Sequence, residues 1–163
     1  MKKPSATSFP KPPEVTFFTD RDLGKGFPQI LRENGLSVER YADHFGELNV
    51  PDETWIAFAA VESFVAVSHD RNIRSDPVAI QAVMKNGGQL FILRGKNLSG
   101  AEKAGLFLRA LPGIYRVLED HPGAFIAVVS RGTTRHGGEK AEVRVRLTYE
   151  EWSRGTAVFG DGE

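Results

Sequence analysis

The chain has 163 residues, 40% of them hydrophobic and 26% charged, a composition typical of one soluble globular domain with a sizeable core. Lysine plus arginine and aspartate plus glutamate number 21 each, so the net charge gives no indication of a nucleic-acid partner. The absence of cysteine excludes disulfides, zinc–thiolate sites and thiol nucleophiles, and it fits a reducing cytosol.

The first residues predict a flexible leader. Residues 1–13 are rich in proline, lysine and serine and contain no apolar h-region, so we expect neither order nor a secretory signal there. The longest apolar run, residues 55–61, is far too short to span a bilayer. These features predict a cytoplasmic protein with no membrane partner.

Apolar runs then alternate with helical patterns. We expect strands at residues 15–19, 37–42, 64–69, 89–93, 124–129 and 141–148. We expect helices at residues 24–34, 51–62, 76–86 and 99–118, the last kinked or broken at Pro112, and a loop over residues 43–49. The alternation predicts a three-layer α/β/α sandwich around a mostly parallel sheet. The last two strands, joined by a glycine-rich loop, predict an antiparallel hairpin. One domain would span residues 14–152, followed by a flexible tail at 153–163.

Three aspartates occupy the positions where such a sheet gathers ligands. Asp20 and Asp70 each follow an apolar strand, and Asp52 opens a helix on the face of Trp55 and Ile56. Carboxyl ends of parallel strands and the starts of the following helices share one edge, which is where α/β proteins bind ligands. Carboxylates gathered there repel one another unless a hard cation lies among them, and oxygen ligands suit Mg²⁺ or Mn²⁺. The pattern predicts a metal-dependent phosphodiesterase site.

Each acid also has a plainer interpretation. Acids in the first turn of a helix complement the helix dipole, which would explain Asp52 without a metal. Asp70 could pair with Arg71 or Arg74 instead. For Asp22 we favour a helix cap, and Asp76 before Pro77 has the pattern of another. Asp20 and Asp70, directly at strand ends, remain the stronger ligand candidates.

A fourth acid and the histidines are less defined by the sequence. Asp43 and Glu47 lie just past the second strand, and the sequence does not decide whether either joins the site. His44 and His69 could donate to phosphate, although a lone histidine near a strand end is more often structural.

Other catalytic motifs are absent, and one basic cluster is present. The chain has no G-x-S-x-G elbow and no phosphate-binding P-loop. Basic residues gather near the C-terminal hairpin and would either track a phosphate backbone or form a solvated face among Glu139 and Glu142. These basic residues are Arg131, Arg135, Lys140, Arg144 and Arg146. Strict alternation would place Arg144 and Arg146 on one exposed face.

The motifs together resemble the PIN-domain family, in its PIN-like branch related to VapC-type toxins. The resembling segments fall within residues 15–95 and comprise residues 17–23, 31–35, 43–45, 51–55 and 67–73. The resemblance implies a Rossmann-like α/β/α sandwich, acidic residues that hold Mg²⁺ or Mn²⁺, and cleavage of RNA. In bacteria it also implies a toxin that is neutralised by a cognate antitoxin protein.

The resemblance assigns roles residue by residue. Asp20 matches the first strand-end acid, Asp52 the acid that opens a helix, and Asp70 the acid of the Ser-x-Asp stretch. The family's usual glutamate on a helix has no clear match, and Asp43 is our substitute as a further metal ligand. The forked donors of arginine suit phosphate oxygens, so we expect Arg21, Arg71 or Arg74 to contact the substrate.

Two functions follow from these expectations. The leading hypothesis is a metal-dependent endoribonuclease, with Asp20, Asp52 and Asp70 as catalytic metal ligands. The alternative is a non-catalytic PIN-like binding or regulatory module, which the missing glutamate favours. The sequence leaves the RNA target, the preferred ion and the oligomeric state, including a homodimer, open.

Overall fold

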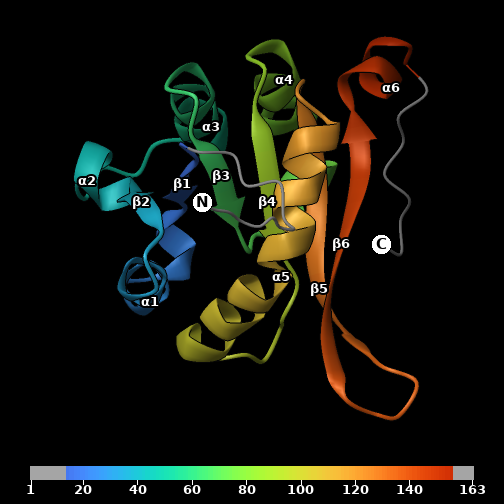
Figure 1. The fold of residues 1–163 in the computed structure, drawn as a ribbon. Helices are drawn as coiled ribbons and strands as arrows, with labels where there is room; N and C mark the ends of the chain where they lie inside the picture. Colours follow the sequence, from blue (N-terminus) through green and yellow to red (C-terminus); the bar gives the residue numbers. More distant parts are fainter. Residues whose placement is uncertain (1–13, 156–163) are drawn as a thin grey trace, which may run out of the picture.

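Strands and helices alternate through residues 14–155, the part of the chain that the computed structural model describes (Figure 1). The strands are β1 (Thr16–Thr19), β2 (Ser37–Arg40), β3 (Val65–Ser68), β4 (Gln89–Leu93), β5 (Phe125–Thr133) and β6 (Glu139–Thr148). The α-helices are α1 (Gly26–Glu33), α2 (Tyr41–Phe45), α3 (Asp52–Val61), α4 (Pro77–Lys85), α5 (Gly100–Asp120) and α6 (Tyr149–Ser153). Two short 3-10 helices, η1 (Arg21–Leu23) and η2 (Arg71–Ser75), follow β1 and β3.

The strands form a six-stranded sheet in the order β2-β1-β3-β4-β5-β6. The first five strands in this order are parallel, and β6 runs antiparallel to β5. The chain builds outward from β1 to β2 and then returns to place β3 on the other side of β1. The strand order therefore reverses between β1 and β3, which is where open α/β sheets bind ligands.

Helices cover both faces of the sheet, as the alternation of the sequence predicts (Figure 1). Phe17 packs with residues of α1 and α5 on one face. Its neighbour Phe18 packs with residues of α2, α3 and α4 on the other. Successive side chains of a strand point to opposite faces, and burying one aromatic side chain stabilises the fold by about 2–3 kcal/mol. The expected three-layer α/β/α sandwich with a C-terminal antiparallel hairpin is confirmed.

Two expectations about the elements were wrong. The second strand ends at Arg40, and the expected loop that follows begins with the short helix α2. The last two strands are longer than expected, because β5 continues to Thr133 and pairs with β6 from Glu139 onward. Of the expected flexible ends, residues 1–13 and 156–163 lie outside the described residues.

Helix α5 runs unbroken from Gly100 to Asp120 with Pro112 inside it. It begins with a capping box, in which Ser99 and Glu102 bond to each other's backbone N–H groups. Figure 1 shows the helix changing direction along its length. Proline removes one helical hydrogen bond and crowds the preceding turn, which accounts for a kink rather than a break.

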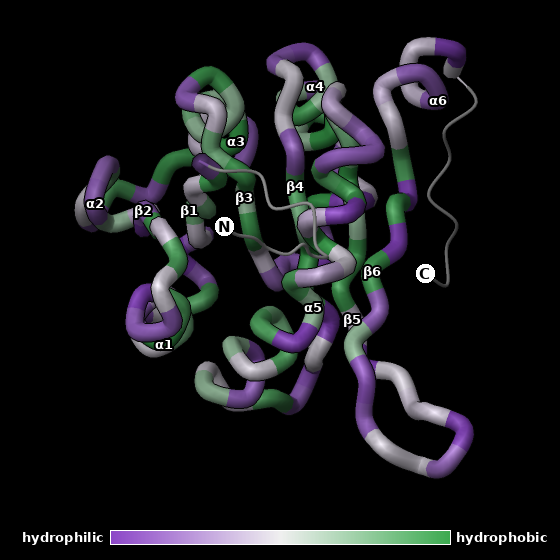
Figure 2. Tube along the Cα trace, viewed as in Figure 1, coloured by the Kyte–Doolittle hydropathy of each residue, from purple (hydrophilic) through white to green (hydrophobic). Residues whose placement is uncertain are grey.

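The β5–β6 hairpin contains an irregularity that interrupts the expected alternation. Ile126 pairs with Leu147 and Ala127 with Val145, so Arg146 is an extra residue in β6. Val145 consequently packs against the face of α1 and α5, whereas Leu147 packs on the opposite face. The outer end of the hairpin is hydrophilic, in contrast with the hydrophobic inner strands (Figure 2). No helix in residues 14–155 is long and apolar enough to cross a membrane.

Candidate active site at the β1–β3 edge

Asp20 lies at the point where the strand order reverses. Its backbone N–H donates to the carbonyl of Val67 at 2.9 Å, which extends the β1–β3 pairing by one residue. Its side chain is nearly enclosed, with 5% of the residue exposed. The sheet therefore holds this carboxylate rigidly at the carboxyl edge.

Ser68 joins Asp20 to Asp70. The Ser68 hydroxyl donates to Asp20 Oδ2 at 2.7 Å and accepts from the backbone N–H of Asp70 at 3.0 Å. Asp70 in turn caps η2, with its Oδ1 accepting from the backbone N–H of Asn72 at 2.9 Å. The sheet thus brings the two strand-end acids to the same edge, as the sequence predicts.

Asp52 is held by the helix that it opens. Trp55 Nε1 donates to Asp52 Oδ1 at 3.0 Å. The Trp55 ring is 1% exposed and stacks on Phe18 of β1, with 5.7 Å between ring centroids. The core therefore fixes the orientation of the half-buried Asp52 carboxylate.

The carboxylates at this edge influence one another's pKa values. Burial raises the pKa of Asp20 to about 6; the Ser68 hydrogen bond lowers it, and the charges of Asp22 and Asp52 add smaller increases. Burial likewise raises the pKa of Asp52, and Asp70, Asp22 and Asp76 add to that rise. A cation placed among these groups would reverse this effect by favouring the ionised carboxylates.

Asp22 belongs to this electrostatic group, although we expected it to cap a helix. It lies inside η1, and the caps of η1 and α1 are Asp20 and Lys25. The only local indication was its spacing of two residues from Asp20. Within residues 14–155, no three His, Cys, Asp or Glu side chains are grouped closely enough to hold a metal ion.

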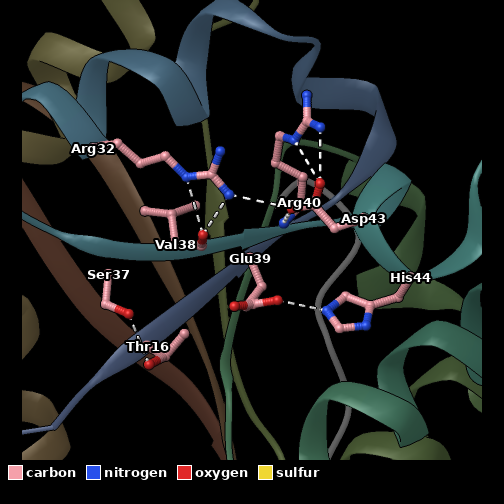
Figure 3. Close-up of polar contacts among 8 residues, drawn as sticks. All are labelled: Thr16, Arg32, Ser37, Val38, Glu39, Arg40, Asp43 and His44. Carbon is pink, nitrogen blue, oxygen red and sulfur yellow. Dashed lines mark hydrogen bonds and ion pairs between the residues drawn. The ribbon is translucent and has the colours of Figure 1, made fainter.

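Asp43 lies in a different environment (Figure 3). Its Oδ1 accepts from Arg40 Nη2 at 2.8 Å, and its Oδ2 accepts from the Arg40 backbone N–H at 2.9 Å and from Arg32 Nη2 at 3.2 Å. Hydrogen bonds from Arg40 lower the pKa of Asp43 to about 2. Both oxygens are therefore engaged by arginines, and we leave Asp43 out of the site.

The three candidate arginines differ in accessibility. Arg21 is exposed, donates to Asn49 Oδ1 at 2.8 Å and lies over the Tyr41 ring at 5.4 Å from its centroid. Arg71 is also exposed. Arg74 is only 5% exposed within η2, so it is poorly placed to meet a substrate. Arg21 and Arg71 remain candidates for phosphate contact.

A cavity of about 580 Å³, here called the Asp70 cavity, opens beside the acids. Its charged lining comprises two acidic and four basic side chains: Asp22, Asp70, Arg71, Arg94, Lys96 and Lys103. A second cavity of about 460 Å³ is lined by Asp20, Arg21 and Tyr41, among others. Acidic and basic side chains therefore line cavities at the same edge of the sheet.

Each of the two histidines considered above has a polar partner in the structure. His44 Nε2 lies 2.6 Å from Glu39 Oε1 (Figure 3). The His44 ring also packs on Phe58. His69 Nδ1 lies 2.6 Å from Lys103 Nζ in the lining of the Asp70 cavity. Lys103 was missed because it lies 34 residues from His69, and no local motif marks the pair.

The comparisons with known proteins agree with this architecture. A family model described as a PIN like domain matches residues 15–95, which contain Asp20, Asp52 and Asp70. A Mycobacterium tuberculosis protein named "Putative ribonuclease VapC45" is 32% identical over 116 residues, covering 69% of this chain and 83% of that protein. The chain matches no solved structure. The family-model match over residues 15–95 and the similarity to this relative show that the chain belongs to the PIN-like domain family.

Proposed function

We propose that this protein is a divalent-metal-dependent endoribonuclease that acts in the cytoplasm as the toxin of a toxin–antitoxin pair. Its substrate would be RNA, and its protein partner a cognate antitoxin. Family membership and the name of the mycobacterial relative support this proposal. The observation that carries it is the grouping of Asp20 and Asp70 through Ser68 at the β1–β3 edge, with the charge of Asp52 acting on Asp20.

The donor chemistry of this edge fits Mg²⁺ or Mn²⁺. Asp20, Asp52 and Asp70 would hold the ion, with Asp22 in place of Asp43 as a further candidate. Burial raises the pKa values of Asp20 and Asp52, and neighbouring carboxylates add to the rise through a repulsion that a bound cation would relieve. When bound, the ion supplies Lewis acidity, which favours ionisation of an attacking water and offsets the charge that develops on the phosphate.

The residues of the chain have distinct tasks in this proposal. Ser68 orients the Asp20 carboxylate, and Trp55 orients that of Asp52, so neither acid must be ordered when substrate arrives. Arg71 and Arg21 would contact phosphate oxygens through forked N–H donors. The cations of the Asp70 cavity would attract the RNA strand toward the acids.

Cleavage of total RNA tests the proposal. We expect the purified protein to cut RNA with Mn²⁺ or Mg²⁺ and to stop when EDTA is added. Asp20→Asn and Asp70→Asn should abolish cutting, whereas Asp120→Asn, the same change at an exposed position where α5 ends, should not. Retained cutting by Asp20→Asn would remove this residue from the mechanism.

The same assay distinguishes the alternative function. If wild-type protein binds RNA but cuts none with either ion, a non-catalytic PIN-like binding module becomes the better description. Co-expression with the product of a neighbouring small open reading frame tests the antitoxin: a stable complex that suppresses cutting is the expected outcome.

A further inference from the structure

The Asp70 cavity contains a lysine whose position the proposed ligand set does not explain. Lys103 lies in α5, which follows β4, and its Nζ is 2.6 Å from Nδ1 of His69, at the end of β3. Both side chains are part-buried and line the cavity together with Asp22 and Asp70. Within residues 14–155, the ammonium group of Lys103 makes no ion pair with a carboxylate.

The chemistry of the pair determines its protonation. An ammonium group has three donors and no acceptor, so His69 Nδ1 must be the acceptor and its proton must lie on Nε2. One of the three N–H groups of Lys103 is therefore engaged, and two are left for another acceptor.

The surroundings indicate which acceptor this is. Four cations and two acids line the cavity, and a divalent ion held by the acids would make the local charge still more positive. An anion with several oxygens is the complementary ligand, and the phosphate backbone of RNA supplies one at every nucleotide.

We propose that Lys103 binds a backbone phosphate of the RNA strand in the Asp70 cavity, and that His69 positions its ammonium group for that contact. This inference rests on the proposed function for the identity of the strand. It assigns His69 a positioning role that acts through Lys103, and it makes α5 part of the substrate site.

RNA affinity measured as a function of salt tests the role of Lys103. The probe is a fluorescein-labelled single-stranded RNA 12-mer of mixed sequence in EDTA, where metal-dependent cutting is absent. Lys103→Met should weaken binding and reduce the slope of log K against log salt by about 0.7, the contribution of one phosphate contact. Raising NaCl from about 50 to about 200 mM should therefore weaken binding by the variant about 2.6-fold less than binding by the wild type.

Matched variants separate charge from folding. Lys103→Arg should retain most of the slope, because it keeps the cation. Lys85→Met, the same change at an exposed position where α4 ends, should leave the slope unchanged. Melting temperatures of all variants show whether a loss of binding reflects unfolding.

A double-mutant cycle tests the role of His69. His69→Ala should weaken RNA binding in the wild-type background and have no further effect in Lys103→Met, because its contribution passes through the lysine. Additive losses would show that His69 acts independently and would overturn the positioning role.

The outcomes also distinguish this inference from the proposed function. If wild-type protein cuts RNA but Lys103→Met retains the wild-type slope, the lysine contact is refuted and the nuclease stands. If Lys103→Met lowers the slope but no protein cuts RNA with Mn²⁺, the phosphate contact stands and the nuclease is refuted. Absence of RNA binding by the wild type overturns the contact.

Discussion

Asp20 has the environment least favourable to its own charge. The residue is 5% exposed, and burial raises the pKa of its carboxylate to about 6 from an ordinary value of 3.8. This rise corresponds to roughly 3 kcal/mol against the ionised form in the folded protein. The folded state therefore binds the Asp20 proton more tightly than the unfolded state does, and the penalty on folding applies in full above pH 6 and disappears below the ordinary pKa.

The first prediction follows because the ionised Asp20 carboxylate lowers the stability of the folded protein at neutral pH. In metal-free buffer at pH 7.5, Asp20→Asn should raise the free energy of unfolding by up to roughly 3 kcal/mol, because it removes the buried charge. The difference from wild type should shrink as the pH falls from 6 to 4. Urea denaturation across this pH range measures it, with Asp120→Asn as control. An equal difference at pH 7.5 and pH 4.5 would contradict the assignment.

Mn²⁺ should reverse the order of stability of the wild type and the Asp20→Asn variant. An ion that binds only the folded state raises the melting temperature by mass action. The wild type should therefore gain thermal stability with Mn²⁺ at millimolar concentration or below, and Asp20→Asn should not. A wild-type melting curve that is unchanged across the titration would count against the metal site.

A second prediction concerns Ser68. Its hydroxyl lowers the pKa of Asp20, so Ser68→Ala should raise that pKa further. The pH above which the full Asp20 penalty on folding applies should therefore move upward. More Mn²⁺ should also be needed for RNA cleavage. Ser153→Ala, a change in the C-terminal helix α6, should alter neither the pH dependence nor the Mn²⁺ requirement.

At the scale of elements, the caps separate structural acids from candidate ligands. Asp76 caps α4, with its Oδ1 accepting from the backbone N–H groups of Val78 at 3.0 Å and Ala79 at 3.4 Å. Asp22 caps neither of the adjacent helices and lines the Asp70 cavity. The two acids should therefore respond to substitution in opposite ways.

The third prediction compares them directly. Asp76→Ala should lower the free energy of unfolding by about 1 kcal/mol, the usual loss for a helix cap, and leave RNA cleavage nearly unchanged. Asp22→Ala should change stability by less than about 0.5 kcal/mol and reduce cleavage. Chemical denaturation and initial cleavage rates measure both effects. A stability loss from Asp22→Ala with normal cleavage would return Asp22 to a purely structural role.

The accuracy of the sequence-based expectations also varies between elements. The inner strands β3 and β4 were predictable because both faces are covered, so their sequences are almost wholly apolar. Helix α2 was not, because its start depends on the side chain of Arg40 and on the contact of Asp43 with Arg32, 11 residues away. The polar end of β5 lacks a strand pattern, since it is held by backbone pairing with β6.

The same limit applies to the candidate site. Strand ends and helix starts can be recognised in the sequence, so Asp20, Asp52 and Asp70 could be chosen as candidates from it. The contacts that orient them cross the sheet: Ser68 and Asp20 are 48 residues apart. Only the strand order brings such residues together, and a single sequence does not specify it.

On the scale of the whole molecule, the hairpin extends from the same edge as the site. Strand β5 runs parallel to β1 and β3, so its end at Thr133 and the following turn lie at their carboxyl edge (Figure 1). Along β6, acidic side chains lie near several of the basic ones. Glu142 Oε2 is 3.6 Å from Lys140 Nζ, and Glu142 Oε1 is 3.7 Å from Arg144 Nη2. Arg135 lies in the exposed turn, and in residues 14–155 it has no such ion pair.

The fourth prediction uses this difference. Arg135→Ala should weaken RNA binding and lower its salt slope, because an unneutralised charge at the site's edge is removed. Arg144→Ala should leave the slope unchanged and cost no more than about 0.5 kcal/mol of stability, as expected for an exposed ion pair. Equal slopes for wild type and Arg135→Ala would exclude the turn from the RNA path.

Strand β6 is also the outermost strand of the sheet, and no strand within residues 14–155 pairs with its outer side. A ten-residue edge of this kind can template pairing with another chain and so promote aggregation. Its alternating charges at Lys140, Glu142 and Arg144 make that pairing costly, because a second copy would bury them, and the extra residue Arg146 bends the ladder. By this physical argument, the charged side chains of β6 disfavour pairing of a second copy along the edge of the sheet, a consequence that does not depend on RNA.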